Sequence, residues 1–393
     1  MIPAVMPTYG RWDVAAERGE GCYLYASDGR KFLDFTSGIA VTSLGHCHPH
    51  LIEAVTQQAQ KLWHTSNMFQ IPGQQRLAQR LVANSFADTV FFNNSGAEAV
   101  ELSLKVARKY QSETGHPERY RVIGCHGSFH GRSFATLAAA GAEAYLKGFG
   151  PVMDGFDHVA FNNLNEMRAA VTEQTAAILV EPVQGEGGVR APSRDYLKGL
   201  RDICDEFGLV LVYDEVQSGM GRTGKLFAHE WAGVPPDVMA VAKALGNGLP
   251  VGACLATEKA AVGMVAGSHG STFGGNPLAM AAGNAVLDVM LEPGFFERTQ
   301  RMARLLWGKL EGLVGAYPKL FGELRGSGHL LGIRCQPNLT AGDFVAKLRA
   351  EGLLCLTAGD NVLRILPPLV AGEREIDEAL GIMHKVAKGW PAS

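Results

Sequence analysis

Residues 209–250 read LVLVYDEVQSGMGRTGKLFAHEWAGVPPDVMAVAKALGNGLP and contain two apolar runs of strand length, at 209–213 and 238–242. Asp214 directly follows the first run, and Lys243 directly follows the second. Unbroken apolar runs of this kind are typical of parallel strands buried on both faces of a sheet. Neighbouring parallel strands end at the same sheet edge, where open α/β folds bind ligands. The pattern therefore predicts that this acid and this amine share one site.

Each of these two residues also has an ordinary structural interpretation. An Asp at the end of a strand often caps the next turn, and a Lys there often extends into solvent. Both residues are followed by a loop of polar residues and glycine, at 216–219 and 245–248. This shared context favours a common ligand over two unrelated surface side chains.

The composition is that of an ordinary globular protein, with 47% hydrophobic and 19% charged residues in a chain of 393. A net charge of −3 gives no electrostatic reason to expect a nucleic acid or a membrane surface as partner. No run of about 18 apolar residues could span a membrane, and the N-terminus has no apolar signal core. We therefore expect a soluble, cytoplasmic protein.

The seven cysteines have no metal-site spacing, and their odd number predicts free thiols in a reducing compartment. His46, Cys47, His48 and His50 form one candidate metal site. Adjacent residues of an extended loop point in opposite directions, however, and no second cluster supplies further ligands. A turn that leads into a helix near Leu51 is favoured, and no metal is expected.

Strand-like and helix-like segments alternate along most of the chain, which predicts an α/β fold with a mostly parallel sheet. A second alternation after Pro293 predicts a smaller C-terminal domain, joined by an N-terminal hairpin at 22–35. We expect residues 1–45 to join the small domain, a large domain carrying the predicted site at 46–293, and the small domain at 294–393.

The segment that begins at Ser95 is a candidate for binding a phosphate group. Ser95-Gly96-Ala97-Glu98 opens a predicted helix after a short strand. Ser95 and Glu98 fit a capping box, and the N–H groups of the helix start equally fit a phosphate. The sequence leaves both interpretations open.

Residues Gly219–Gly224 match G-x-G-x-x-G after a strand, a pattern of nicotinamide dinucleotide-binding folds. The next strand ends in Lys243 instead of the acid that would bind the ribose. The thirteen residues from 225 to 237 are also too few for a crossover helix. Leu226 stands where a P-loop needs Ser or Thr. A nucleotide-binding oxidoreductase remains the alternative from a different functional class.

A phosphate-binding helix start, an acid and a lysine at one sheet edge together suit pyridoxal 5'-phosphate. The lysine amine condenses with the aldehyde of this cofactor, and the acid keeps its pyridine nitrogen protonated. The protonated ring then accepts electrons from the reacting carbon.

The chain resembles the class III aminotransferases of fold type I over nearly its whole length. The motifs that carry the resemblance occur in the family's order and are Ser95-Gly96-Ala97-Glu98-Ala99, Phe129-His130-Gly131-Arg132, Glu181-Pro182-Val183-Gln184-Gly185-Glu186, Asp214-Glu215-Val216-Gln217, Lys243, and Ser271-Thr272-Phe273-Gly274-Gly275-Asn276-Pro277. The resemblance implies a large cofactor-binding domain with a mostly parallel seven-stranded sheet, and a smaller α+β domain.

The resemblance also implies roles for the matching residues. Lys243 and Asp214 would be catalytic: Lys243 would bind the cofactor covalently and later move a proton, and Asp214 would pair with the pyridine nitrogen. Phe129 would stack on the cofactor ring, and Gln217 would bond its hydroxyl. The further cofactor-binding residues would be Ser95, Gly96, Ala97, Glu215, Val216 and, from the partner subunit of a homodimer, Thr272.

Four residues would contact the substrates. Arg132 would bind the distal carboxylate of the donor, and Ser271 would also contact substrate. Arg364 would bind the α-carboxylate of glutamate. Glu186 would pair with Arg364 during the donor half-reaction and move aside during the other. Glycines on both sides of Glu186 would permit that movement.

Within the family, the pattern most resembles members that transfer the δ-amino group of N2-acetyl-L-ornithine to 2-oxoglutarate. Their products are N-acetyl-L-glutamate 5-semialdehyde and L-glutamate, in arginine biosynthesis. Rival donors are ornithine, succinylornithine, N-succinyl-diaminopimelate and 4-aminobutyrate. Two departures from the family pattern bear on substrate fit: Asn247 where glycine is common, and Thr42 where asparagine is common.

Overall fold

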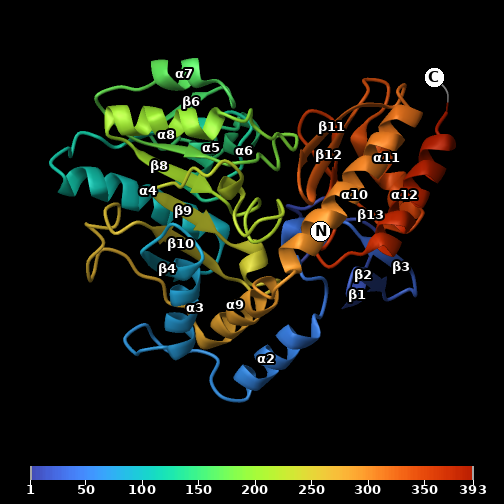
Figure 1. The fold of residues 1–393 in the computed structure, drawn as a ribbon, viewed down its shortest axis with the longest axis horizontal. Coiled ribbons are helices and arrows are strands. Elements are labelled where there is room, and N and C mark those ends of the chain that lie inside the picture. The colour runs from blue at the N-terminus through green and yellow to red at the C-terminus, as the bar shows by residue number, and fades with distance from the viewer. Residues whose placement is uncertain (1, 392–393) are drawn as a thin grey trace.

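The computed structural model describes residues 2–391 and is built around a seven-stranded sheet with the order β4-β10-β9-β8-β7-β5-β6 (Figure 1). Strand β10 is antiparallel to both of its neighbours, whereas the strands from β9 to β6 are parallel. This confirms the predicted α/β fold with a mostly parallel seven-stranded sheet. The strands are β4 (Thr89–Asn93), β5 (Arg121–Cys125), β6 (Phe156–Val159), β7 (Thr175–Val180), β8 (Val210–Asp214), β9 (Val238–Val241) and β10 (Gly252–Ala256).

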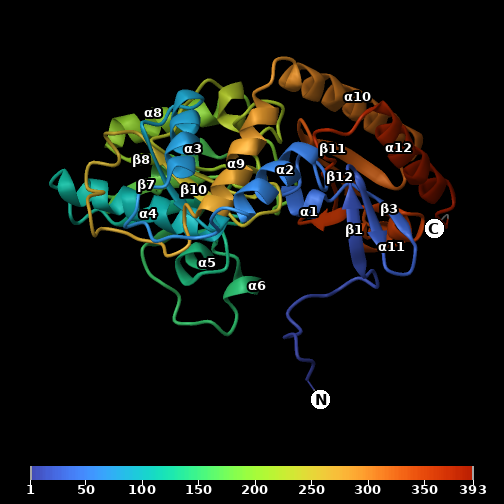
Figure 2. The same ribbon diagram turned by 90° about the horizontal axis from the view of Figure 1, so that it is seen from below.

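Helices cover both faces of this sheet, with α4 and α5 on one side and α3, α8 and α9 on the other (Figure 2). Successive strand residues point to opposite faces. In β8, Val210 and Val212 therefore pack with α4, while Leu211 and Tyr213 pack on the side of α8. The elements around the sheet are α2 (Pro49–Ala59), α3 (Pro72–Ala83), α4 (Gly96–Glu113), α5 (Phe134–Ala140), α6 (Glu143–Leu146), α7 (Leu164–Ala169), α8 (Tyr196–Phe207), α9 (Pro277–Met290) and the 3₁₀ helices η1 (Ala228–Trp231) and η2 (Lys243–Leu245).

A smaller body combines the N-terminal strands with the C-terminal part of the chain (Figure 1). Its two four-stranded sheets have the orders β1-β2-β3-β13 and β11-β12-β15-β14, and β3 pairs with β13 in parallel. This pairing supports the proposed grouping of residues 1–45 with 294–393. The elements are β1 (Ala16–Glu20), β2 (Tyr23–Ala26), β3 (Lys31–Asp34), β11 (Phe321–Ser327), β12 (Leu330–Cys335), β13 (Leu353–Leu354), β14 (Leu356–Ala358), β15 (Val362–Ile365), α1 (Ser37–Ala40), α10 (Phe295–Ala316), α11 (Ala341–Ala350) and α12 (Glu373–Lys388).

The short α1 segment is a left-handed turn. Ser37, Gly38, Ile39 and Ala40 have φ values of 46°, 59°, 66° and 62°. Left-handed backbone costs L-residues other than glycine roughly 1–2 kcal/mol each, so the turn needs support from its surroundings. The Ser37 hydroxyl supplies part of it by donating to the Leu366 carbonyl at 2.6 Å.

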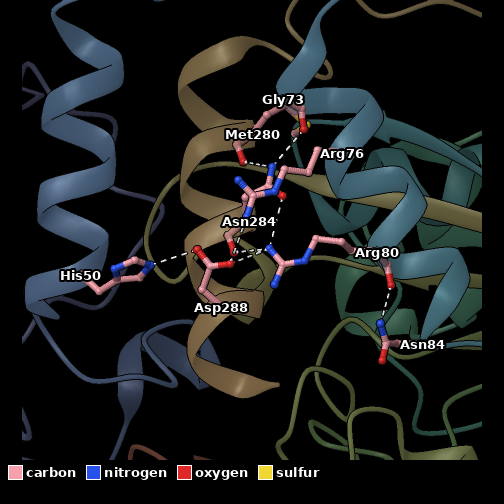
Figure 3. Close-up of polar contacts among 8 residues, drawn as sticks. All are labelled: His50, Gly73, Arg76, Arg80, Asn84, Met280, Asn284 and Asp288. Carbon is pink, nitrogen blue, oxygen red and sulfur yellow. Dashed lines mark hydrogen bonds and ion pairs between the residues drawn. The ribbon is translucent and has the colours of Figure 1, made fainter. Parts of the chain in front are cut away.

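A polar network joins α2, α3 and α9 (Figure 3). The Asp288 carboxylate of α9 contacts His50 of α2 at 3.0 Å, and Arg76 and Arg80 of α3 at 3.4 and 2.9 Å. One turn earlier on α9, Asn284 donates to a backbone carbonyl at the start of α3. This network fixes the helices on either side of residues 60–71.

All seven cysteines lie within residues 2–391 and are unpaired, as predicted. In the same part of the chain, no helix has both the length and the apolar character that a membrane crossing needs.

Candidate active site

Asp214 and Lys243 lie at the ends of two parallel neighbours, β8 and β9, and line one cavity of about 480 Å³. The two residues therefore share one site, as predicted. Lys243 has a φ of 48°, an unfavourable left-handed conformation for a residue with a Cβ. This turn redirects the chain from β9 into η2. Burial of the Lys243 amine lowers its pKa to about 8.

The start of α4 forms one end of the cavity. The Ser95 hydroxyl accepts the N–H of Glu98 at 3.2 Å, and the Glu98 carboxylate accepts the N–H that precedes Ser95 at 2.5 Å. Only the Ser95 half of the predicted capping box forms, because Glu98 accepts from Asn94 and not from Ser95 itself. These side-chain bonds do not use the N–H groups of Gly96 and Ala97, which no helix carbonyl reaches and which stay open to a ligand. A Cβ on Gly96 would stand 2.6 Å from a methyl group of Val216, so any larger residue there would force Val216 to move. The cap and the phosphate site are thus compatible.

The lining of the cavity fits pyridoxal phosphate. The helix start offers N–H groups to a phosphate, and Asp214 offers a carboxylate to a ring nitrogen. Phe129 and Val216 offer an aromatic and an aliphatic surface to a flat ring, and Lys243 offers an amine to an aldehyde. These are the groups that this cofactor requires.

The sequence reasoning assigned no role to two buried residues of the cavity lining, His130 and Glu181. His130 Nδ1 lies 2.7 Å from Asp214 Oδ2, and the Val216 N–H donates to Oδ1 at 2.9 Å. Burial by itself would lower the pKa of His130, but the Asp214 carboxylate outweighs it and raises that pKa. Glu181 accepts the Phe129 N–H at 2.9 Å, and burial raises the pKa of Glu181 to about 7. Both His130 and Glu181 belong to motifs that carry the family resemblance, and this was the only sequence feature that could have indicated a role for them.

Arg364 of β15 forms an ion pair with Glu186, which lies in the loop after β7. The Arg364 Nη1 to Glu186 Oε1 distance is 2.5 Å, and the side chains are 3% and 27% exposed. Burial opposes ionisation of Glu186, but Arg364 outweighs it and lowers the pKa of Glu186. Arg364 also donates to Gln217 Oε1 at 3.2 Å, so Gln217 lies between this pair and the cavity that it lines.

Arg132 lines the same cavity but is held differently. Its guanidinium lies 3.8 Å from the ring centroid of Tyr145 and 5.5 Å from that of Phe129. Among residues 2–391 it has no ion pair and no hydrogen-bond acceptor, so these rings orient its charge without neutralising it. Tyr145 of α6 was missed, because nothing in its sequence context links it to Arg132.

Five expected site residues do not line the cavity: Glu186 and Arg364, which pair behind Gln217, and Glu215, Ser271 and Thr272. Glu215 does not line the cavity; its carboxylate accepts the N–H groups of Ala228 and His229 at 2.7 and 2.9 Å. Ser271 and Thr272 also lie outside the cavity. The Ser271 hydroxyl accepts the Gly274 N–H at 3.0 Å.

The dinucleotide-like segment Gly219–Gly224 follows β8 and contacts the smaller body through Arg222. Its Arg222 is fully buried and donates to the carbonyl of Pro367 at 2.6 Å and the hydroxyl of Ser43 at 2.8 Å. Burial lowers the pKa of Arg222 to about 9. A dinucleotide site would require a helix to begin within this segment, and none does. The oxidoreductase alternative is therefore wrong.

Comparisons with known proteins agree with this site. The family model "Aminotransferase class-III" matches residues 5–387. An acetylornithine aminotransferase of Mesorhizobium japonicum is 56% identical, over 98% of this chain and 96% of its own. One of Agrobacterium fabrum is 53% identical, with the same coverage of both chains.

Solved structures show the same fold. The ornithine aminotransferase of Toxoplasma gondii, with PLP at partial occupancy in its active site, has a TM-score of 0.93 at 31% identity, covering 98% of this chain and 92% of its own. The N-acetylornithine aminotransferase of Stenotrophomonas maltophilia has a TM-score of 0.85 at 37% identity, covering 97% of each chain. The chain therefore belongs to the class III aminotransferases.

Proposed function

We propose that this aminotransferase uses pyridoxal 5'-phosphate to transfer the δ-amino group of N2-acetyl-L-ornithine to 2-oxoglutarate, in arginine biosynthesis. The products are N-acetyl-L-glutamate 5-semialdehyde and L-glutamate. Relatives named acetylornithine aminotransferase, such as those at 56% and 53% identity, support this donor. Ornithine is the second candidate donor, supported by the similarity to ornithine aminotransferase structures.

When bound, pyridoxal phosphate supplies an aldehyde that takes up the amino group and a protonated ring that accepts electrons. The Gly96 and Ala97 N–H groups would hold its phosphate. Asp214, oriented by His130, would pair with the ring nitrogen. Because the pKa of Lys243 is lowered to about 8, its Nζ is neutral in a large fraction of molecules near that pH. It can then act as a nucleophile, and as a base that holds and returns a proton.

The observation that carries the choice of reaction is the contrast between Arg364 and Arg132. Glu186 neutralises Arg364 behind Gln217, while Arg132 keeps an unpaired charge in the lining of the cavity. An ω-amine donor carries its carboxylate far from the reacting carbon, whereas 2-oxoglutarate carries one beside it. Arg132 is thus available to the donor, and Arg364 becomes available to the acceptor once Glu186 moves aside.

The Glu186→Ala variant tests this assignment. It leaves Arg364 permanently free, so the half-reaction with glutamate should keep its rate or become faster. The half-reaction with acetylornithine should slow about tenfold, because Arg364 then also attracts the donor carboxylate. Stopped-flow absorbance follows both half-reactions. An equal slowing of both would contradict a switching role for Glu186.

We further propose a homodimer with shared active sites. Ser271 and Thr272 lie outside the cavity of their own subunit, and Asn67 donates to the Ser271 carbonyl at 3.0 Å. Large apolar side chains are exposed beside them, which favours burial against a second subunit. They are Trp63, Met68, Phe69 and Phe273. Sedimentation velocity tests the proposal, and a fully active monomer would contradict it.

A further inference from the structure

Asn247, four residues after Lys243, binds the backbone of a distant segment through both ends of its side-chain amide. Its Oδ1 accepts the Leu44 N–H at 2.7 Å, and its Nδ2 donates to the Gly45 carbonyl at 3.1 Å. Leu44 and Gly45 are buried, so the side chain satisfies two backbone groups that water does not reach.

The two segments that Asn247 joins, one from each body, both contribute to the cavity lining. Val41 lines the cavity just before Leu44, and residues 248–251 line it just after Asn247. The first segment follows the left-handed turn of α1 in the smaller body. The second follows Lys243 at the edge of the seven-stranded sheet. The amide therefore sets the position of Val41 relative to Lys243.

Backbone in the left-handed region persists only where its surroundings hold it. The α1 turn is held at its start by the Ser37 hydroxyl, which donates to Leu366. The chain that follows the turn is held at Leu44 and Gly45 by Asn247. Val41 lies between these two anchors, so its place in the cavity depends on both.

We propose that Asn247 is a positioning residue that sets donor selectivity by fixing the cavity wall at Val41. The cavity extends from Lys243 to Arg132 and includes Val41, so this wall helps to define the length of donor that fits. Asparagine suits the position because it tolerates the observed φ of 45° and carries both a donor and an acceptor. The inference rests on the proposed function, because it concerns the choice of amino donor.

The Asn247→Gly variant tests the proposal, because glycine adopts a φ of 45° freely and only the amide is lost. Two lost hydrogen bonds should raise KM for the best donor about tenfold and lower the selectivity between the two best donors. The affinity for pyridoxal phosphate should not change, because Asn247 touches none of the residues proposed to hold it. Amide hydrogen exchange at Leu44 in the cofactor-free protein should become faster.

Asn162→Gly is the matched control. Asn162 is also left-handed, with φ 64°, and its Oδ1 accepts the N–H and the hydroxyl of Ser193 at 3.0 and 2.8 Å, outside the cavity. This variant should keep the wild-type selectivity. Unchanged selectivity in Asn247→Gly would overturn the proposal, as would a parallel loss of all activities and cofactor affinity. A wild-type preference for another donor would overturn the donor assignment only, because selectivity is measured between the two best donors.

Discussion

Lys243 has a buried amine on a left-handed backbone, and both features follow from its place at the end of β9. Burial lowers the pKa of the amine to about 8 from an ordinary value of 10.5. Below the lowered pKa most Lys243 amines are protonated and unreactive, and well above it nearly all of them are neutral and reactive. Uptake of pyridoxal phosphate by the cofactor-free protein should therefore become faster up to about pH 8 and then level off.

Absorbance measurements of initial uptake rates between about pH 6 and 10 check this expectation, with Lys243→Ala as the control for non-covalent binding. An ordinary lysine would give a rate that keeps rising about tenfold per pH unit above pH 8.5. Such a profile would contradict the effect of burial on Lys243.

Arg132 is the second residue for which the structure gives a sharp expectation. An Arg132→Ala variant should lose about 10- to 100-fold in kcat/KM for acetylornithine, because a charge-assisted pair with the donor carboxylate is lost. Arg132→Lys keeps the charge but not the planar stacking on Tyr145, and should fall between Ala and wild type. Steady-state kinetics with donors that lack a carboxylate should show little change. Equal losses for both donor classes would indicate a structural role.

The residues that sequence reasoning placed in the site are those whose motif fixes their position along the chain. Asp214 and Lys243 end apolar strands, and Gly96 opens a helix, so topology carries them to one sheet edge. His130 reaches Asp214 across 84 residues, and only the folded chain shows that contact. Tyr145 was not predictable, because its stacking on Arg132 depends on the path of the connection after α5.

At the scale of elements, apolar runs predicted the central strands well because helices cover both faces of the sheet. Val238–Val241 is fully buried for this reason. Strand β11, with the sequence FGELRGS, was missed because its glycines and exposed charges mask any apolar pattern. The left-handed turn of α1 was also missed, since only Gly38 among its four residues favours that conformation.

The Asp288 network should stabilise the fold because it joins three helices, α2, α3 and α9. An Asp288→Ala variant leaves three basic side chains of α2 and α3 without their shared acid. The groups are partly exposed, so solvent screening limits the expected loss to about 1–2 kcal/mol in the free energy of unfolding. Chemical denaturation measures this quantity.

Asp202→Ala is the control for the Asp288 variant. Asp202 pairs with Lys198 alone on the surface of α8, where both side chains are more than half exposed. This change should cost no more than about 0.5 kcal/mol. Losses of equal size in the two variants would show that the shared carboxylate adds nothing beyond a single surface pair.

At the scale of the whole molecule, the site is built from two bodies. Asp214 and Lys243 come from the seven-stranded sheet, while Arg364 comes from β15 of the smaller body and reaches Glu186 beside them. The family resemblance named the members of this group and implied the Glu186–Arg364 pair, but it could not show that Arg132 stacks on Tyr145. The Glu186–Arg364 pair exists only where the two bodies meet, because its two members come from different bodies.

The preference among amino donors tests the central claim most directly. The measurement is kcat/KM for glutamate formation from 2-oxoglutarate with acetylornithine, ornithine, succinylornithine, N-succinyl-diaminopimelate and 4-aminobutyrate. The account predicts the highest value for N2-acetyl-L-ornithine, with one glutamate formed per semialdehyde. A higher value for any other donor, or no glutamate from acetylornithine, would contradict it.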